Sequence, residues 1–257
     1  TNAKVTALDA DGKLAAVLAY SGTNGSDAIY TKPVQKNGAA YEIYIDGKDT
    51  HKSVQVNGAG SAAEVTCYTA TVTIRGNIPA PVIHMTNGVE TRSFSGANGS
   101  YAATHVLLAR NAGGTEKAYD LTVDGTVDNL PVQVSSTNKN IVLQYWAVKF
   151  YSMDSDGDYP AASAPTDTVY VRDTCVMPAR ANSTVRISGY TVAGWSETPW
   201  TIGSEANAAF NFAQAITRDL SLYSNYEKPI VRINSLVYTD ASGNTGGNGA
   251  YYRMENL

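Results

Sequence analysis

The chain has 257 residues, a net charge of −4 and only 16% charged residues, fewer than the ~25% usual in soluble domains. Its pI near 5.4 gives no basic footprint for nucleic acid or an anionic membrane. Because no run of about 18 apolar residues occurs, the sequence predicts no membrane-spanning segment. Tyr (17) far outnumbers Phe (4), and Gly is frequent (22). This profile is typical of extracellular β modules with polar, weakly charged faces.

Short phrases recur along the chain and predict a modular architecture. They are SGTNGS at 21–26 and SGANGS at 95–100, YEIYIDG at 41–47 and YDLTVDG at 119–125, and SVQV at 53–56 and PVQV at 131–134. The last two pairs share one offset of 78, so no gap separates them. We therefore expect modules of roughly 75 residues. An array of similar small modules usually extends, presents or binds, and seldom forms one catalytic pocket.

The first module is assigned to residues 1–74 and the second to 75–147. In the first, the expected strands lie near residues 5–8, 14–20, 29–31, 41–45, 54–56 and 65–74. Asp-Gly and Asn-Gly turns separate them at intervals of roughly 8–12 residues, which is typical of an all-β sandwich. The second module is expected to repeat this plan, with residues 81–83 matching the strand at 16–18. The linkers between modules are short, which restricts bending between them.

A third module, residues 148–227, differs from the first two. Strands are expected near residues 148–151, 169–177, 189–195 and 216–223. A helix is expected over 204–215, because this stretch is rich in Ala and begins with Ser-Glu. Residues 228–257 are too few for a domain. They contain an alternating strand at 230–238, so they are interpreted as the start of a further domain or as a docking strand.

The third module resembles the Listeria–Bacteroides repeat, the internalin B-repeat type of bacterial surface proteins. The matching phrases are VKF at 148–150, DG at 156–157, VYVRDTCVMP at 169–178, GYTVAGW at 189–195, FNF at 210–212 and ITRDLSLY at 216–223, with Tyr226 at the place of the closing Trp. Arg172 replaces the Gly of the Y-G-D phrase, and Val192 replaces the Phe of G-Y-T-F. The resemblance implies a β-grasp-like fold for this module.

The first two modules are similar to the companion β modules of large gut-bacterial adhesins. They share the phrase G-x-Y-x-I-Y-x-D-G-x-D-T, here residues 38–50, and the aromatic closing strand at 145–150. Together the two resemblances imply a bacterial cell-surface protein with many repeats. The expected fold is all-β: tandem small β-sandwich modules followed by a β-grasp-like repeat module.

Residues that carry chemistry in other proteins are interpreted here as structural. His51, His84 and His105 have no Cys, Ser or Asp partner at a motif spacing, so they are expected to be solvated or packing side chains. Asp154, Asp156 and Asp158 alternate as calcium ligands do, but the later ligands of that pattern are missing. This stretch, like the weaker one at 9–12, is expected to be an acidic turn.

Three further groups of residues are interpreted mainly as structural. Aromatic residues in the strand patterns, among them Tyr41, Tyr119, Tyr145, Trp146, Tyr190, Trp195 and Tyr223, are expected in the core, because small modules need large side chains to build one. Trp200 is the aromatic residue expected at a surface. Lys4, Glu42 and Asn57 are candidates for an isopeptide bond, although no spacing selects them. Cys67 and Cys175 are expected to be buried thiols, and a disulfide between them stays open.

The sequence thus predicts a non-enzymatic, extracellular, cell-wall-associated adhesin or stalk fragment that projects or presents a binding domain. It predicts no catalytic, cofactor-binding or metal-binding residues, no cofactor and no nucleic-acid partner. The partners left open are a host glycan or protein and neighbouring modules of the same protein. The alternatives are a module that binds a host glycan or protein, a filament-forming surface subunit, and an accessory region of a surface enzyme.

Overall fold

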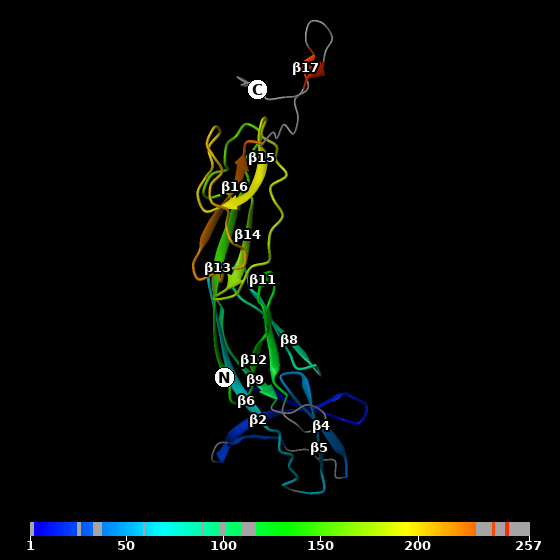
Figure 1. Ribbon diagram of the computed structural model, residues 1–257. Helices are drawn as coiled ribbons and strands as arrows, with labels where there is room; N and C mark the ends of the chain where they lie inside the picture. The colour runs from blue at the N-terminus through cyan, green and yellow to red at the C-terminus, as the bar shows by residue number, and fades with distance from the viewer. Residues whose placement is uncertain are drawn as a thin grey trace. The chain divides into compact units, whose positions relative to one another are not determined.

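The computed structural model describes residues 3–24, 27–32, 38–58, 60–88, 90–97, 101–108, 117–229, 238–239 and 245–246. These residues form eighteen strands joined by turns and bends, with no helix among them (Figure 1), so the all-β expectation is confirmed. The chain divides into two compact units. The first comprises residues 1–149, 167–180 and 211–221, and the second comprises 150–166, 181–210 and 222–257.

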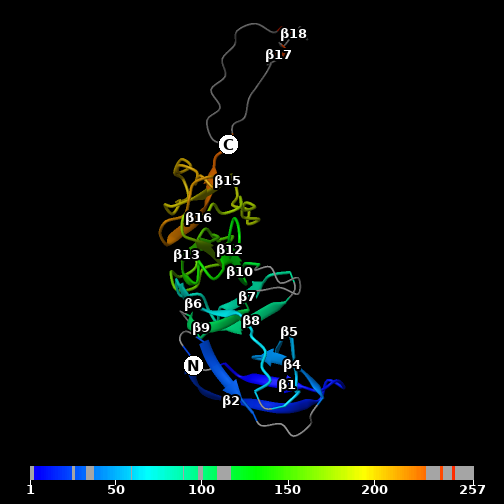
Figure 2. The same cartoon turned by 90° about the horizontal axis from the view of Figure 1, so that it is seen from below.

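A five-stranded antiparallel sheet forms at the start of the chain (Figure 2). Its strands, in sheet order, are β3 (Asp27–Thr31), β2 (Leu14–Asn24), β1 (Val5–Leu8), β4 (Ala40–Ile45) and β5 (Lys48–Gln55). Apolar side chains at alternate positions of a strand share one face of the sheet. That face carries a core of buried residues: Val5, Ala7, Ala16, Tyr41, Ile43, Ile45 and Val56.

The next part of the chain builds its core between two layers of strands. One layer has the order β12 (Val132–Val134), β10 (Tyr119–Val123), β7 (Val82–Thr86) and β8 (Thr91–Ser95). In the other, β6 (Cys67–Arg75) lies between β9 (Tyr101–Leu108) and the first half of β13 (Asn140–Tyr151). Residues from both layers share one buried cluster, which includes Ile83, Leu121, Val72, Ile74 and Leu143.

The sequence repeat is also a repeat of strand register. Val5 pairs with Ile45 and Ala7 with Ile43, whereas 78 residues later Ile83 pairs with Val123 and Met85 with Leu121. β7 and β10 are therefore the counterparts of β1 and β4. The expected match of residues 81–83 with 16–18 is wrong, because these residues enter β7, which occupies the place of β1 and not of β2.

The strand expected to close the first module, residues 65–74, lies elsewhere. This stretch forms β6, which pairs antiparallel with β9 and parallel with β13. Its side chains Tyr68, Ala70, Val72 and Ile74 are buried in the core of the second repeat. In the structure, the second repeat comprises β6 to β10, β12 and the first half of β13. Strand alternation alone predicts which side chains are buried, but it does not say against which sheet they pack. The module boundaries at 74–75 and 147–148 stay predictions.

The remaining strands belong to the sheet that β13 enters in its second half. The sheet order is β11 (Thr126–Val127), β14 (Asp167–Arg172), β13, β16 (Leu220–Glu227) and β15 (Thr191–Ser196). β17 (Tyr238–Thr239) and β18 (Thr245–Gly246) pair with each other. The strand predicted at 230–238 lies, except for its last residue, outside the described residues.

The helix expected over 204–215 is absent, and this described stretch consists of turns and irregular backbone. Its backbone groups bond to other parts of the chain: the amide of Phe210 donates to the carbonyl of Trp195, and the amide of Asn207 donates to Oδ1 of Asn225. These bonds satisfy the groups that a helical ladder would have used. Helix propensity is a weak preference that tertiary contacts override.

Trp195 is buried, as expected for an aromatic residue of a strand pattern. Its ring meets Phe150 edge to face at 5.0 Å between centroids, and its Nε1–H donates to the carbonyl of Ala181. Tyr223 stacks on Tyr151 at 5.0 Å. It pairs with Ser196 in the ladder, one position beyond Trp195, so its side chain points to the opposite face.

We expect Trp195→Ala to lower the free energy of unfolding by about 3–5 kcal/mol, because the change removes a large buried ring and leaves a cavity. Urea unfolding followed by circular dichroism measures the difference. Leu130→Ala is the control, since Leu130 is 72% exposed and its truncation should change stability by no more than about 0.5 kcal/mol. Equal midpoints for the two variants would contradict the core assignment.

Candidate functional site

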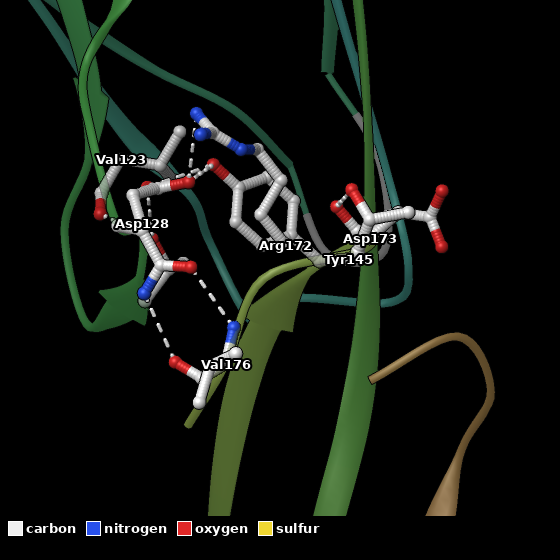
Figure 3. A network of polar contacts seen from close by, with 9 residues as sticks. Val123, Asp128, Tyr145, Arg172, Asp173 and Val176 are labelled. Atoms are coloured by element: carbon white, nitrogen blue, oxygen red, sulfur yellow. Dashed lines mark hydrogen bonds and ion pairs between the residues drawn. The ribbon is translucent and has the colours of Figure 1, made fainter. Parts of the chain in front are cut away.

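A cluster of polar contacts forms around the carboxylate of Asp128 (Figure 3). The hydroxyl of Tyr145 donates to its two oxygens at 3.2 and 3.1 Å, and the hydroxyl of Thr126 donates to Oδ2 at 3.0 Å. The guanidinium of Arg172 forms an ion pair with Oδ1 at 3.2 Å. Arg172 and Asp128 are largely buried, with 17% and 12% of their side chains exposed, so water screens this ion pair less than it would at a surface.

Further hydrogen bonds extend this group of contacts. The side-chain amide of Asn129 donates to the carbonyl of Val176 at 3.0 Å, and its oxygen accepts the Val176 amide at 2.9 Å. The indole of Trp146 donates to Asp173 at 2.7 Å. The cluster therefore ties residues 126–129, which follow β10, to residues 172–176, at and just after the end of β14, and ties both to Tyr145 and Trp146 of β13. We call this set of contacts the Asp128 cluster.

Arg172 is one of two residues at which this chain departs from the repeat pattern that residues 148–227 resemble, and a Gly stands at its place in that pattern. In the structure this departure supplies the cation of the Asp128 cluster. Burial and the Asp128 charge raise the pKa of Tyr145 well above its usual range, so its hydroxyl stays protonated and remains a donor. Each of these groups contacts another, so the cluster fastens residues 126–129, residues 172–176 and β13 to one another.

The structure brings a serine, a histidine and an aspartate together, which sequence spacing did not reveal. Nδ1 of His84 lies 2.8 Å from Oγ of Ser93, and its Nε2 lies 3.0 Å from Oδ2 of Asp124. Ser93 is the direct cross-strand partner of His84, whereas Asp124 follows the end of β10. Only the pairing of β7 with β8 and β10 could have predicted this contact.

The exposure of these groups favours a surface ladder over a reactive site. The His84 and Asp124 side chains are 32% and 60% exposed. Because catalytic charge stabilisation depends on a water-excluded site, an open arrangement of this kind adds little to the reactivity of Ser93. Cross-strand polar pairs on an outer face instead contribute modest sheet stability.

His105, on β9, pairs with the buried Ala70 and so faces the core. It belongs to a partly buried group of polar side chains. Its Nε2 is 2.6 Å from the Tyr101 hydroxyl, and its ring lies 3.7 Å, between centroids, from that of Phe94. Burial, followed by the positive charge of Arg92, lowers the pKa of His105. Arg92 also lies 3.4 Å from Glu90, which accepts a hydrogen bond from Tyr119. These contacts make His105 a packing side chain, one of the two kinds of side chain expected for the three histidines.

The two acidic stretches are turns built in the same way. Oδ1 of Asp154 accepts the amides of Asp156 and Asp158, and Oδ1 of Asp9 accepts those of Asp11 and Lys13. In both, the first Asp closes the turn with its own backbone as well. Among the described residues, no three His, Cys, Asp or Glu side chains gather in a way that could hold a metal ion.

The prediction that Trp200 lies at a surface is wrong. It is 2% exposed, and its ring meets those of Tyr190 and Tyr226 at 4.9 and 5.2 Å. The segment before it is held because the Asn207 side chain donates to the carbonyls of Thr198 and Pro199. A tryptophan outside the repeat pattern thus completes a core instead of offering a ring to a ligand.

The remaining candidates are not brought together. Lys4, Glu42 and Asn57 are all exposed, whereas an isopeptide bond needs a buried carboxylate beside the reacting pair. The two cysteines are not bonded to each other. Cys175 is buried as expected, but Cys67 is exposed, because it begins β6 outside the core.

Comparisons with known proteins identify no family. No family model matches the chain, and no curated protein matches it. Among solved structures, one neighbour is the pilus adhesin SpaC of Lactobacillus rhamnosus GG, with 11% identity and a TM-score of 0.27. The alignment covers 95% of this chain and 42% of that adhesin, so this chain spans less than half of its length. None of the described residues forms a helix long and apolar enough to cross a bilayer.

We expect Asp128→Ala to lower the free energy of unfolding by about 3 kcal/mol, because the Arg172 guanidinium and the Tyr145 hydroxyl lose their buried partner. Differential scanning calorimetry at pH 7 measures the change. Asp156→Ala is the control, since it removes an exposed carboxylate and should change stability by less than about 0.5 kcal/mol. If both variants unfold like the parent chain, the Asp128 cluster does not stabilise the fold.

We expect stability to fall with decreasing pH in a way that depends on His105. Its pKa is lower in the folded than in the unfolded chain, where it is about 6.5. The unfolded state therefore binds the proton first, and stability is lost as the pH falls through about 6.5 toward the folded pKa. Urea midpoints at pH 7.5 and 5.5 measure the loss.

In His105→Gln this part of the pH dependence should disappear. Thr104→Gln, an exposed change on the same strand, should retain it. Identical midpoint shifts for both variants between the two pH values would show that His105 does not contribute.

Proposed function

We propose that this chain is a non-enzymatic segment of a bacterial surface adhesin or stalk, which projects or presents a binding domain outside the cell. Its low charge content, its repeated β modules and the two sequence resemblances support this proposal. The residues brought together by the fold fasten strands to one another, as the Asp128 cluster does. They add structural rigidity, which a projecting segment requires.

The pairing of β6 with β13 is the observation that carries the proposal. The chain enters the second repeat through β6 and leaves it through β13, and the two strands run parallel, with Asn140 beside Thr71 and Gln144 beside Arg75. Tension applied to the start of β6 and the end of β13 acts at opposite ends of this ladder. Because ladder bonds lie across the strands, such tension loads them together in shear and not one after another.

The connection from the second repeat to the sheet of β14 and β16 also carries tension through hydrogen-bonded strands. β13 continues without interruption from its pairing with β6 into the sheet with β14 and β16. The amide of Asp173 donates to the carbonyl of Gln144, and the amide of Ala147 donates to Asp219. Load leaving the second repeat therefore passes through a covalent strand with bonded neighbours on the way.

One observation favours a second candidate, an assembly or binding role. Among the described residues, large apolar side chains that are at least 39% exposed include Leu14, Val17, Tyr20 and Ile29, all on β2 and β3. Leu14 and Val17 share the face of β2 that points away from the core, and exposed apolar groups on one face are typical of a surface that contacts another polypeptide. A presenting segment that also binds a partner is compatible with both roles.

The load-bearing role predicts that resistance to force depends on direction. Handles on Cys67 and on Lys149→Cys pull β6 against β13 in shear. Handles on Cys67 and on Lys139→Cys pull at the same end of the two strands and separate them one bond at a time. Cys67, Lys139 and Lys149 are exposed, so the two attachments disturb the fold equally little. Buried Cys175 is replaced by Ser in both variants.

In single-molecule force spectroscopy, we expect the shear geometry to unfold at a force at least about twice that of the other geometry, since forced unfolding is governed by the unfolding rate under load. Equal forces in the two geometries would contradict the load-bearing role. A matched urea midpoint of the two variants excludes a difference in thermodynamic stability as the cause.

A further inference from the structure

The sheets of this chain end in edge strands, whose unpaired backbone groups can accept a strand of another chain unless something blocks them. Most edge strands among the described residues are blocked in a usual way. β11, β12, β17 and β18 have only two or three residues each. β3, β5 and β15 belong to ladders whose register shifts at an irregularity, and the short strand β8 carries Arg92.

β9 is an edge strand without such a feature. Among the residues that the structure describes, its one ladder partner is β6. The register with β6 is unbroken over all eight residues, from Tyr101 to Leu108. The sequence of the strand, YAATHVLL, contains no Lys, Arg, Asp, Glu, Pro or Gly. A long, regular and uncharged edge of this kind is a template for pairing with another strand.

One hydrogen bond shows which backbone groups of β9 point away from β6. The amide of Thr71 donates to the carbonyl of Lys139 at 2.7 Å, so the backbone groups of Thr71 point toward β13. Thr71 and Thr104, which lie opposite each other on β6 and β9, are therefore a non-hydrogen-bonded pair. The N–H and C=O of Thr104 consequently point outward. Because the two kinds of pair alternate along an antiparallel ladder, those of residues 102, 106 and 108 point outward as well.

The side chains agree with this assignment. Side chains of a non-hydrogen-bonded pair lie close together, and the hydroxyls of Thr71 and Thr104 are 3.3 Å apart. Ala102 and Thr104 are both exposed. β9 therefore offers solvent a row of four backbone donors and four acceptors, which are strong hydrogen-bonding groups.

A second copy of the same strand fits this edge. Two β9 strands present no formal charge to each other, so no like-charge pair opposes their antiparallel alignment. An alignment about a two-fold axis at His105 places residue 102 opposite 108 and residue 104 opposite 106. In this register every outward residue of one copy meets an outward residue of the other, whereas a shift by two residues in either direction leaves one without a partner. Closed two-fold symmetry is also the commonest arrangement of soluble homo-oligomers.

We propose that the second repeat is a dimerisation site, at which β9 of one copy pairs antiparallel with β9 of a second copy about His105. The new ladder joins the β13–β6–β9 layers of the two copies into one continuous sheet. His105 then lies opposite its own copy. Burial, followed by the positive charge of Arg92, lowers the pKa of His105, so at pH 7.5 the two imidazoles are neutral and do not repel each other.

This dimer goes beyond the proposed function and does not rest on it. Tension passes along β6 and β13, whereas dimerisation uses the edge of β9 that faces away from both. The surface is also separate from the exposed apolar residues of β2, such as Leu14 and Val17. The force experiment and the dimerisation experiment can therefore fail independently.

Thr104→Pro tests the proposal. Proline removes the outward N–H of residue 104 and brings a ring to the middle of the edge, but it removes no hydrogen bond of the ladder with β6, and proline is tolerated at such edge positions. Thr104→Val is the matched control, because it removes the same hydroxyl and keeps the N–H. Every variant carries Cys67→Ser, since Cys67 is exposed and its thiol could link two chains.

Sedimentation equilibrium at pH 7.5 is the readout, from about 1 µM to about 1 mM chain, which spans moderate to weak affinities. We expect dimers of the Cys67→Ser parent and of Thr104→Val, and dimerisation at least about tenfold weaker in Thr104→Pro. A parent that stays monomeric throughout would overturn the proposal. Dimers that persist unchanged in Thr104→Pro would overturn it too, because they would use another surface.

Amide exchange of the Cys67→Ser parent, resolved by residue with NMR, tests the same ladder even if the proline variant does not fold. Raising the concentration until dimers predominate should slow exchange at residues 102, 104, 106 and 108 by about tenfold or more, because these amides enter a ladder. The amides of 103, 105 and 107 already bond to β6 and should change far less. Equal slowing along the whole strand, or none at the four outward positions, would contradict pairing through β9.

Discussion

The parallel pairing of β6 with β13 is the constraint on which the rest of the second repeat depends. Parallel strands cannot be joined by a tight turn, so the chain between them must form a crossover. Here that crossover, residues 76–139, contains β7, β8, β9, β10, β11 and β12. Thr71 and Asn140 pair across this whole crossover and so lie far apart in sequence. Such long-range pairing makes folding slow and cooperative.

Much of the fold follows from local signals in the sequence, but the partner of each strand does not. The alternating residues of β1, β4, β7 and β10 and the Asp-Gly turns predict strands and their buried faces, and the offset of 78 extends to their register. β6 alternates equally well, yet it packs in the following repeat. Nothing in a single strand states which sheet it covers. The expected helix at 204–215 failed for a related reason, since distant groups satisfy its backbone.

The polar contacts also divide into those that the local sequence predicts and those that only the fold brings about. The acidic turns at Asp9 and Asp154 could be predicted, because an Asp that caps its own turn is a local arrangement. The Asp128 cluster could not, since it joins residues on strands that only the fold brings together. Its one sequence signal was Arg172, where the repeat pattern that residues 148–227 resemble has Gly.

The position of β6 also sets the unit by which a protein of this kind can grow. A duplication that copied residues 75–147 would copy a core without its central strand, whereas one that began at Cys67 would carry the strand with it. A repeat built like the second receives its central strand from the segment before it, and β13 leaves the second repeat to enter the next sheet. The array therefore has a direction. A duplicated unit keeps a complete core only when its boundary lies before the strand equivalent to β6 and not between β6 and the sheet that it covers.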